Sequence, residues 1–379
     1  MQLNAIKQME RSARADPAVV SLGQGIPFQA SDSAIRRAAT LAIQEGKADC
    51  YSDPQGLVEL RRVIAETLME QHMRYTPDEI LVTAGAIEGL SVALHSVVRP
   101  GRDEVILPTP VYSAYSRAIH LSGGVAVPVL LQERSGWQLD TAQLAAAITK
   151  RTSAILICNP NNPTGSVYPE RTLRELAELA ARHNLCLITD EVYGNMVYDN
   201  AVLFSPAMDA RYRKHVVRIV SFSKDFALTG WRVGFVQADH SRMDELVAVH
   251  DTLVNCAPVV SQYAALAALE HRERILARNR TVYDRHRRLM TGYLDALGPK
   301  VSYVLPEGAY FCFVRVTGVT SSAQLCADLL REQKLAVVPG SDFGPGGEGH
   351  VRLCFGRSAG AIHEGMRRFS TFVRGRGTQ

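Results

Sequence analysis

The feature that most constrains the fold is the alternation of short apolar runs with helical patterns through the middle of the chain. The segments between the runs are amphipathic, as in Glu170–His183, where leucines recur at helical spacing. The alternation predicts an α/β fold with a large domain whose mostly parallel sheet is sandwiched by helices. Six runs are typical of buried strands: Ile80–Thr83, Glu104–Leu107, Ala154–Cys158, Leu185–Thr189, Val216–Ser221 and Val233–Ala238.

After about Val254 the pattern becomes α+β, beginning with a long, mostly helical region over Val259–Leu297. Short strands and two further helices follow: strands Val301–Leu305, Tyr310–Val316, Leu335–Val338 and Val351–Phe355, and helices Ser322–Gln333 and Ala359–Phe372. Residues 1–46 contain no strand that could join the large sheet. We therefore expect a large domain of residues 47–258 and a smaller α+β domain formed by residues 1–46 and 259–379.

The composition argues against several kinds of partner. Lys and Arg number 42 and Asp and Glu 38, so the net charge is +4 with no basic block, and no nucleic-acid partner is expected. No run approaches the roughly 20 apolar residues that a membrane helix needs. Residues 1–20 contain several charged side chains and no continuous apolar run, so a signal peptide is not expected. The seven cysteines form no C-x-x-C pair. We expect a cytoplasmic chain with reduced cysteines, no metal site and no membrane partner.

Four polar segments follow predicted strands, and the one around Lys224 is the most informative. A lysine just past a buried strand can be an amine nucleophile toward an aldehyde cofactor. Ser221, Ser223 and Arg232 suit a dianionic phosphate, because hydroxyls donate and a guanidinium matches phosphate bidentately. A surface lysine in a polar loop is the alternative, which the G-W-R run ending at Arg232 disfavours.

The other three segments are weaker alone. Asp190 directly follows a strand, so it could hold a proton on a buried heterocyclic nitrogen, cap a helix or bind a metal, and Tyr193 could point the same way. The N-P-N-N-P-T-G segment from Asn159 could aim an amide at a ligand or be an ordinary turn. Residues 85–87 open a helix whose first N–H groups could approach a phosphate. Because open α/β sheets bind ligands at the carboxyl ends of their strands, we expect one common site.

A lysine, phosphate ligands and an acidic partner for a ring nitrogen suit pyridoxal 5′-phosphate (PLP) chemistry. The motifs are S-x-S-K-x-F-x-L-x-G-W-R-x-G from Ser221 and N-P-x-N-P-T-G from Asn159. With them the sequence resembles the class I/II aminotransferases, which are fold type I PLP-dependent enzymes of the aspartate aminotransferase superfamily. The resemblance covers nearly the whole chain and keeps the order of the motifs, so it implies that fold.

The resemblance implies a role for each matching residue. Lys224 is similar to the lysine that forms a Schiff base with the cofactor and shuttles a proton. Asp190 is similar to the partner of the pyridine nitrogen, and Tyr193 to a donor to the phenolic oxygen, which completes the implied catalytic set. The implied cofactor-binding residues are Gly85, Ala86, Ile87, Tyr112, Asn162, Asp190, Val192, Tyr193, Ser221, Ser223, Lys224 and Arg232. No metal is implied.

Further motifs extend the implied site. Tyr51, in a Y-x-x-x-x-G motif, resembles a tyrosine that reaches the cofactor phosphate of the neighbouring subunit, which implies a homodimer with shared active sites. A core or surface tyrosine is the alternative. Arg352 resembles the arginine that binds the substrate α-carboxylate, and with Gly25 and Asn162 it makes the implied substrate set. The glycine-rich segment Gly340–Gly349 is interpreted as a mobile loop.

The sequence departs from the family around the substrate side chain. After Pro27 the family has an acidic residue and then an aromatic one, whereas this chain has Phe28 and Gln29, which we expect at the mouth of the side-chain pocket. Ile87 stands where some aspartate-specific relatives have a lysine. With Ile26, these residues favour an apolar or neutral polar substrate side chain.

The implied function is that of a PLP-dependent aminotransferase (EC 2.6.1.-) of amino acid metabolism. It would move an amino group from an L-amino acid to a 2-oxo acid by a ping-pong mechanism. The same fold supports β-lyases, cyclopropane-forming synthases and oxidative deaminases, and the matched residues serve a carbanion step common to all of them. A transcription regulator with an aminotransferase-like domain is a third alternative. It would need an added DNA-binding domain, for which motifs running from Gly25 to Arg352 are expected to leave no room.

Overall fold

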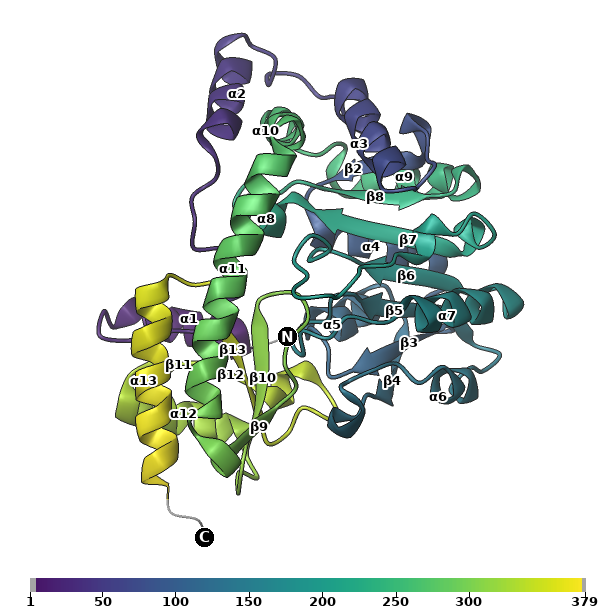
Figure 1. The fold of residues 1–379 in the computed structure, drawn as a ribbon. Helices are drawn as coiled ribbons and strands as arrows, with labels where there is room; N and C mark the ends of the chain where they lie inside the picture. The colour runs from purple at the N-terminus through teal and green to yellow at the C-terminus, as the bar shows by residue number, and fades with distance from the viewer. Residues whose placement is uncertain (1–4, 377–379) are drawn as a thin grey trace.

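A seven-stranded sheet dominates the computed structural model, which describes residues 5–376 (Figure 1). Its strand order is β2-β8-β7-β6-β5-β3-β4. The strands are β2 (Ile80–Thr83), β3 (Glu104–Thr109), β4 (Val125–Leu130), β5 (Thr152–Cys158), β6 (Cys186–Asp190), β7 (Val216–Ser221) and β8 (Gly234–Ala238). Strands β3 to β7 are parallel, and β8 is antiparallel to both β2 and β7. The predicted α/β fold with a mostly parallel sheet is confirmed.

Helices cover both faces of this sheet. They are α3 (Val58–Glu70), α4 (Ala86–Val97), α5 (Ala114–Leu121), α6 (Thr141–Ala146), α7 (Glu170–Arg182) and α9 (His240–Val254). Successive strand residues point to opposite faces. Ile155 and Ile157 of β5 therefore lie in the core that contains Leu173 of α7, while Leu156 lies in the core that contains Leu90 of α4. Both faces of the sheet are buried, which explains the continuous apolar runs in the sequence.

A second, smaller sheet lies beside the first. Its order is β12-β13-β10-β9, all antiparallel, and a two-stranded parallel sheet pairs β1 with β11. These strands are β1 (Val20–Ser21), β9 (Val301–Tyr303), β10 (Phe311–Val316), β11 (Leu335–Ala336), β12 (Val338–Pro339) and β13 (His350–Cys354). The associated helices are α10 (Val259–Glu270), α11 (Arg272–Asp295), α12 (Ser322–Gln333) and α13 (Ala359–Gly375).

The N-terminal elements contact the C-terminal part of the chain. Helix α1 (Ala5–Ala15) packs against β11 and β12, and Val20 of β1 pairs with Leu335. Helix α2 (Ser33–Gln44) packs along α10, which in turn packs against α3 beside the large sheet (Figure 1). Because α10 contacts both parts of the molecule, the domain boundaries after residues 46 and 258 stay a prediction.

Local differences from the sequence prediction have simple causes. Strand β4 was not predicted, because it is an edge strand with Pro128 and partly exposed side chains, so it lacks a buried apolar run. The predicted helical region Val259–Leu297 is two helices that meet at His271. The predicted strand Leu335–Val338 is two strands, because β11 pairs with β1 and β12 pairs with β13.

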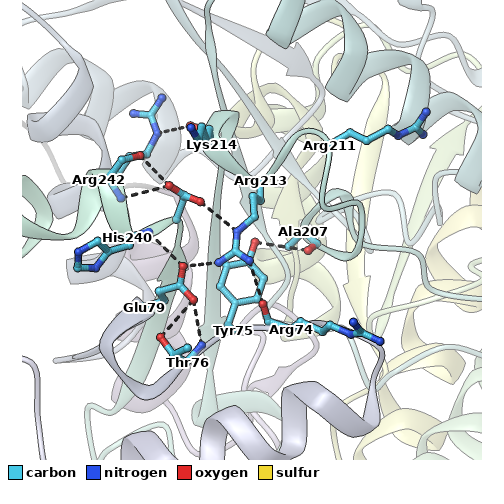
Figure 2. Close-up of polar contacts among 12 residues, drawn as sticks. Arg74, Tyr75, Thr76, Glu79, Ala207, Arg211, Arg213, Lys214, His240 and Arg242 are labelled. Carbon is cyan, nitrogen blue, oxygen red and sulfur yellow. Dashed lines mark hydrogen bonds and ion pairs between the residues drawn. The ribbon is translucent and has the colours of Figure 1, made fainter.

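A polar cluster fastens the edge of the large sheet opposite the carboxyl ends of β5, β6 and β7 (Figure 2). Arg213, just before β7, forms an ion pair with Glu79, donates to the Arg74 carbonyl at 3.0 Å and lies 4.4 Å from the Tyr75 ring centroid. Glu79 also accepts from the backbone N–H of His240 at 3.1 Å. The cluster joins the starts of β2, β7 and α9, and we assign it a structural role.

Within residues 5–376, no helix has the length and apolar character needed to cross a membrane. The same residues contain no group of His, Cys, Asp and Glu side chains able to hold a metal ion.

Candidate active site

A cavity of about 460 Å³ lies at the carboxyl ends of β5, β6 and β7, where the large sheet faces β10 and β13. Its lining includes every site residue predicted from the sequence except Gly85 and Tyr51. The predicted residues that line it are Gly25, Ala86, Ile87, Tyr112, Asn162, Asp190, Val192, Tyr193, Ser221, Ser223, Lys224, Arg232 and Arg352. The remaining lining residues are Lys7, Gln24, Ile26, Tyr115, Thr229 and Phe311.

Lys224 projects into this cavity from the short helix α8 (Phe222–Asp225). The helix begins directly after β7, where the Ser221 hydroxyl accepts the Ser223 backbone N–H at 3.1 Å and caps it. Nζ of Lys224 donates to the Gly25 carbonyl at 2.7 Å. Burial lowers the pKa of Lys224 to about 8, because it disfavours the ammonium form. About a fifth of this amine is therefore neutral at pH 7.4.

Asp190 is the last residue of β6 and is buried beneath the same cavity. Its carboxylate accepts the Tyr115 hydroxyl at 2.7 Å and the Val192 backbone N–H at 3.2 Å. Burial raises the pKa of Asp190 to about 6, and the two hydrogen bonds oppose that rise. This buried carboxylate is suited to hold a proton on a ligand, because a cationic partner would stabilise its ionised form.

Tyr115 was not predicted from the sequence. It lies in the first turn of α5, three residues after Tyr112, which precedes the helix, and the two rings meet edge to face with centroids 5.7 Å apart. That spacing was the available signal, but only the fold brings α5 against the end of β6.

Arg232 and the start of α4 form a positively polarised corner of the cavity. The guanidinium donates to the carbonyls of Thr229 at 3.0 Å and Ala84 at 3.4 Å. Gly85, the N-cap of α4, has φ +85°, and a Cβ there would lie 2.3 Å from Nη2 of Arg232. Glycine is thus required both for the backbone conformation and for the approach of the arginine. Gly85 shapes this corner without lining the cavity.

Arg352 lines the same cavity from the small sheet. It is buried on β13, where Nη1 donates to Oδ1 of Asn162 at 2.9 Å and Nη2 donates to the Gly23 carbonyl at 2.5 Å. Its guanidinium lies 4.3 Å from the Phe311 ring centroid and 5.0 Å from that of Phe343. Nε is buried without a hydrogen-bond partner. A buried guanidinium with an unmatched donor is suited to bind an anion such as a carboxylate.

The remaining walls are aromatic and apolar. Tyr193 is buried, 5.4 Å from the Tyr310 ring and 5.7 Å from the Phe311 ring between centroids, and burial holds its pKa well above the usual value. Its hydroxyl therefore stays protonated and can donate.

Because Oδ1 of Asn162 is engaged by Arg352, its Nδ2 is the group left to donate to a ligand. Gly25 must be glycine, since a Cβ would lie 2.7 Å from the Phe311 ring.

Two expectations about neighbouring segments were wrong. Phe28 and Gln29 do not line the cavity, because both pack on α11: the Phe28 ring lies 5.2 Å from that of His286, and the Tyr283 hydroxyl donates to Gln29 at 3.1 Å. Gly340–Gly349 is not simply a mobile surface loop. Its first four residues form a 3-10 turn that buries Phe343 against Arg352.

Tyr51 lies outside the cavity, and its side chain is 80% exposed. Within this single chain it does not join the other predicted residues.

The cavity fits PLP by its chemistry. Lys224 supplies an amine for the aldehyde, and Asp190 supplies a buried carboxylate for the ring nitrogen. Ser221, Ser223 and Arg232 line one end, where the first N–H groups of α4 have no acceptor within the helix. An amine, a carboxylate and an anion-binding corner in one cavity define the class of a PLP-dependent enzyme.

Comparison with known proteins identifies the family. The pattern of the family "Aminotransferase class I and II" matches residues 17–369. A putative aminotransferase, YugH, of Bacillus subtilis is 37% identical, with 94% of this chain and 92% of the relative covered. An aspartate aminotransferase of Pyrococcus abyssi is 36% identical, with 94% and 92% covered. A solved structure of a single mutant of Thermus thermophilus aspartate aminotransferase superposes with a TM-score of 0.91 at 31% identity, with 98% of this chain and 97% of that chain covered.

The chain belongs to the class I and II aminotransferases. It is an aminotransferase of EC class 2.6.1, it has the fold of aspartate aminotransferase, and it uses PLP. Amino acids and 2-oxo acids are the substrates of this reaction class. The resemblance inferred from the lysine and N-P-x-N-P-T-G motifs is confirmed.

Proposed function

We propose that Lys224 is the residue that binds PLP covalently and moves the proton during amino transfer. The observation that carries this proposal is the position of Nζ, in one cavity with the buried Asp190 carboxylate, the Arg232 corner and the Arg352 guanidinium. The lowered pKa of Lys224 supports it, because a nucleophile and general base must be available as the free amine.

The chain's residues would divide the work as follows. PLP supplies an electron-withdrawing ring and an aldehyde that binds amines. Asp190 would hold a proton on the ring nitrogen, and Tyr193 and the Asn162 amide would donate to the phenolic oxygen. Lys224 Nζ, once released from the cofactor by the donor amine, would take the proton from the substrate α-carbon and return it at the C4′ carbon of the cofactor. Tyr112 and Val192 would contact the two faces of the ring.

Other residues would hold the two anionic groups, which are the phosphate of the cofactor and the α-carboxylate of the substrate. Ser221, Ser223, Arg232 and the Ala86 and Ile87 amides would bind the cofactor phosphate. Arg352 would bind the α-carboxylate, with Gly25 and Asn162 beside it. Because one arginine serves both an L-amino acid and a 2-oxo acid, the two substrates must bind in turn, which predicts ping-pong kinetics.

A half-reaction screen tests this proposal. The PLP-loaded protein is mixed with single L-amino acids in the absence of any oxo acid, and the cofactor absorbance is followed. Conversion of the cofactor to its amino form by a subset of amino acids is the expected result. Release of ammonia, or product formation without a keto-acid acceptor, would instead indicate a lyase, synthase or oxidase.

The lowered pKa of Lys224 predicts a pH dependence for cofactor attachment. Below pH 8 the ammonium form predominates, so the attachment rate should rise about tenfold per pH unit up to about pH 8 and then level off. Stopped-flow absorbance of cofactor-free protein mixed with PLP between pH 6.5 and 9.5 measures this. A rate that keeps rising through pH 9.5 would mean an ordinary lysine pKa and would contradict the assignment.

The functional unit is proposed to be a homodimer in which Tyr51 reaches the partner's cofactor phosphate. Tyr51 is 80% exposed, and Leu41, Ile43 and Val58 near it in the sequence are also more than half exposed. Exposed apolar side chains of this size are typical of surfaces that another chain covers. A shared site would explain why Tyr51 lies outside the cavity of its own chain.

Mixed dimers test the shared site. Subunits with Lys224→Ala are co-expressed with subunits carrying Tyr51→Ala, with a different tag on each, so that mixed dimers can be purified. One site of each mixed dimer then has both native residues, so about half of the native activity per dimer is expected. Activity no higher than that of the Tyr51→Ala protein would show that Tyr51 acts on its own subunit or not at all.

We also propose that the protein is cytoplasmic. The chain would divide into a large domain of residues 47–258 and a smaller domain formed by residues 1–46 and 259–379. All seven cysteines are unpaired, which suits a reducing compartment.

A further inference from the structure

The carboxyl group of Asp225, the residue after Lys224, is buried on a different side of α8 from the active site. Lys224 and Asp225 are the last two residues of this short helix, and Lys224 lines the large cavity whereas Asp225 does not. Asp225 is only 3% exposed and lines a separate cavity of about 60 Å³, together with Leu68 of α3 and Leu276 of α11. The two consecutive side chains therefore serve two different surroundings.

Two asparagine side chains hold Asp225 in place. Nδ2 of Asn195 donates to Oδ2 of the Asp225 carboxylate at 2.7 Å, and Nδ2 of Asn279 on α11 donates to the Asp225 backbone carbonyl at 2.7 Å. Asn195 lies two residues after Tyr193, in the loop that follows β6. The Asp225 side chain therefore ties the helical turn that carries Lys224 to the loop that carries Tyr193.

This carboxylate is costly for the fold. Its Oδ1 has no hydrogen-bond partner among residues 5–376. Burial raises the pKa of Asp225 to about 7, and the hydrogen bond from Asn195 and the charge of Arg218 oppose that rise. A buried carboxylate with an unmatched oxygen destabilises the folded state relative to a small apolar side chain. Stability alone does not account for Asp225, which directs attention to the neighbouring site.

We infer that Asp225 is a positioning residue that fixes Nζ of Lys224 relative to the side chain of Tyr193. The inference rests on the proposed function, in which Lys224 moves the proton and Tyr193 donates to the phenolic oxygen of the cofactor. The relative position of these two side chains then sets where Nζ meets the substrate α-carbon. A misplacement of about 1 Å can lower a rate about 100-fold, so this tie affects the reaction without touching the substrate.

Asp225→Ala removes the tie and the buried carboxylate. We expect the maximal rate constant of the amino half-reaction to fall about tenfold, because Nζ is less well placed. The apparent dissociation constant of the amino acid should stay within about twofold of the native value, because Arg352 is untouched. Two measurements without any amino acid complete the test. The visible circular dichroism of the bound cofactor should change, and the midpoint of thermal unfolding should not fall.

An exchange of the two side chains tests the tie itself. Asn195→Asp alone places two carboxylates against each other, so it should lower the rate constant about as much as Asp225→Ala does. Asn195→Asp combined with Asp225→Asn restores an amide–carboxylate hydrogen bond in the reverse direction. This double variant should regain the rate constant to within about threefold of the native value, together with the native cofactor signal.

Gln324→Glu is the matched control for the exchange. The exposed Gln324 amide on α12 donates to Asp328 at 3.0 Å, and neither residue lines the large cavity. The control also turns an amide that faces an aspartate into a carboxylate, so it should leave the rate constant and the cofactor signal unchanged.

Three results would overturn the inference. They are a native rate constant and cofactor signal in Asp225→Ala, a rate constant that the exchange does not restore, and a lowered thermal midpoint with a native cofactor signal. The last of these would give Asp225 a purely structural role. The proposed function is decided separately, by the half-reaction of the native protein and of the Lys224→Ala protein measured alongside.

Discussion

Replacing Lys224 by alanine is expected to lower kcat by about four orders of magnitude or more. In the proposed scheme the substitution removes the nucleophile that binds the cofactor and the base that moves the α-proton, and a positioned general base alone contributes about 10²- to 10⁴-fold. The fold should persist, because a partly buried amine with a lowered pKa is replaced by a small apolar side chain. Steady-state transamination and far-ultraviolet circular dichroism measure the two effects.

Lys214→Ala is the matched control for this experiment. Lys214 is exposed in the polar cluster of Figure 2, where its backbone carbonyl accepts from Arg242 at 2.7 Å. The control should keep native activity. A Lys224→Ala protein that retained more than a few per cent of the native kcat would refute the assignment of Lys224.

Replacing Arg352 by lysine should lower kcat/KM about 100-fold for both the amino acid and the oxo acid. Lysine keeps the positive charge but loses the planar fork that matches a carboxylate bidentately. It also loses the contacts of the guanidinium with the Asn162 side chain and the Gly23 carbonyl. Charge-assisted hydrogen bonds contribute about 1.5–3 kcal/mol each, so the loss of one or two accounts for a factor of this size. The loss should appear mainly as a raised KM.

The loss of kcat/KM should be the same for the amino acid and the oxo acid, because both substrates carry an α-carboxylate. This equality is what identifies the group that Arg352 binds. Arg315→Lys is the control. Arg315 lies on the neighbouring strand β10, half-exposed and 2.8 Å from Glu133, so its replacement should leave both KM values unchanged. An Arg352→Lys protein with a native KM for either substrate would remove Arg352 from the α-carboxylate position.

The fold was predictable where buried strands produce a clear run of apolar residues in the sequence. Strands β2 and β7 have the predicted bounds, because they are buried on both faces and end at polar residues. Strand β4 was missed because an edge strand has only weak burial. The pairing of β1 with β11 could not be predicted, since two residues on each side carry no periodicity and only tertiary packing brings them together.

The candidate site was predictable where a motif lies at a strand end, and less so elsewhere. Asp190 ends β6 and Lys224 follows the end of the neighbouring strand β7 by three residues, so topology alone brings them close together. Tyr115, Phe343 and Lys7 come from a helix face, a glycine-rich turn and the N-terminal helix. Their positions depend on tertiary packing between elements that are distant in the sequence, which the sequence does not encode locally.

Reductive trapping tests the central claim most directly. The PLP-loaded protein is treated with borohydride, which fixes the cofactor to the lysine that binds it, and the modified peptide is identified by mass spectrometry. The account predicts a single modified lysine, Lys224, and no stable modification of the Lys224→Ala protein. Stoichiometric modification of another lysine, with Lys224 unmodified, would contradict the account.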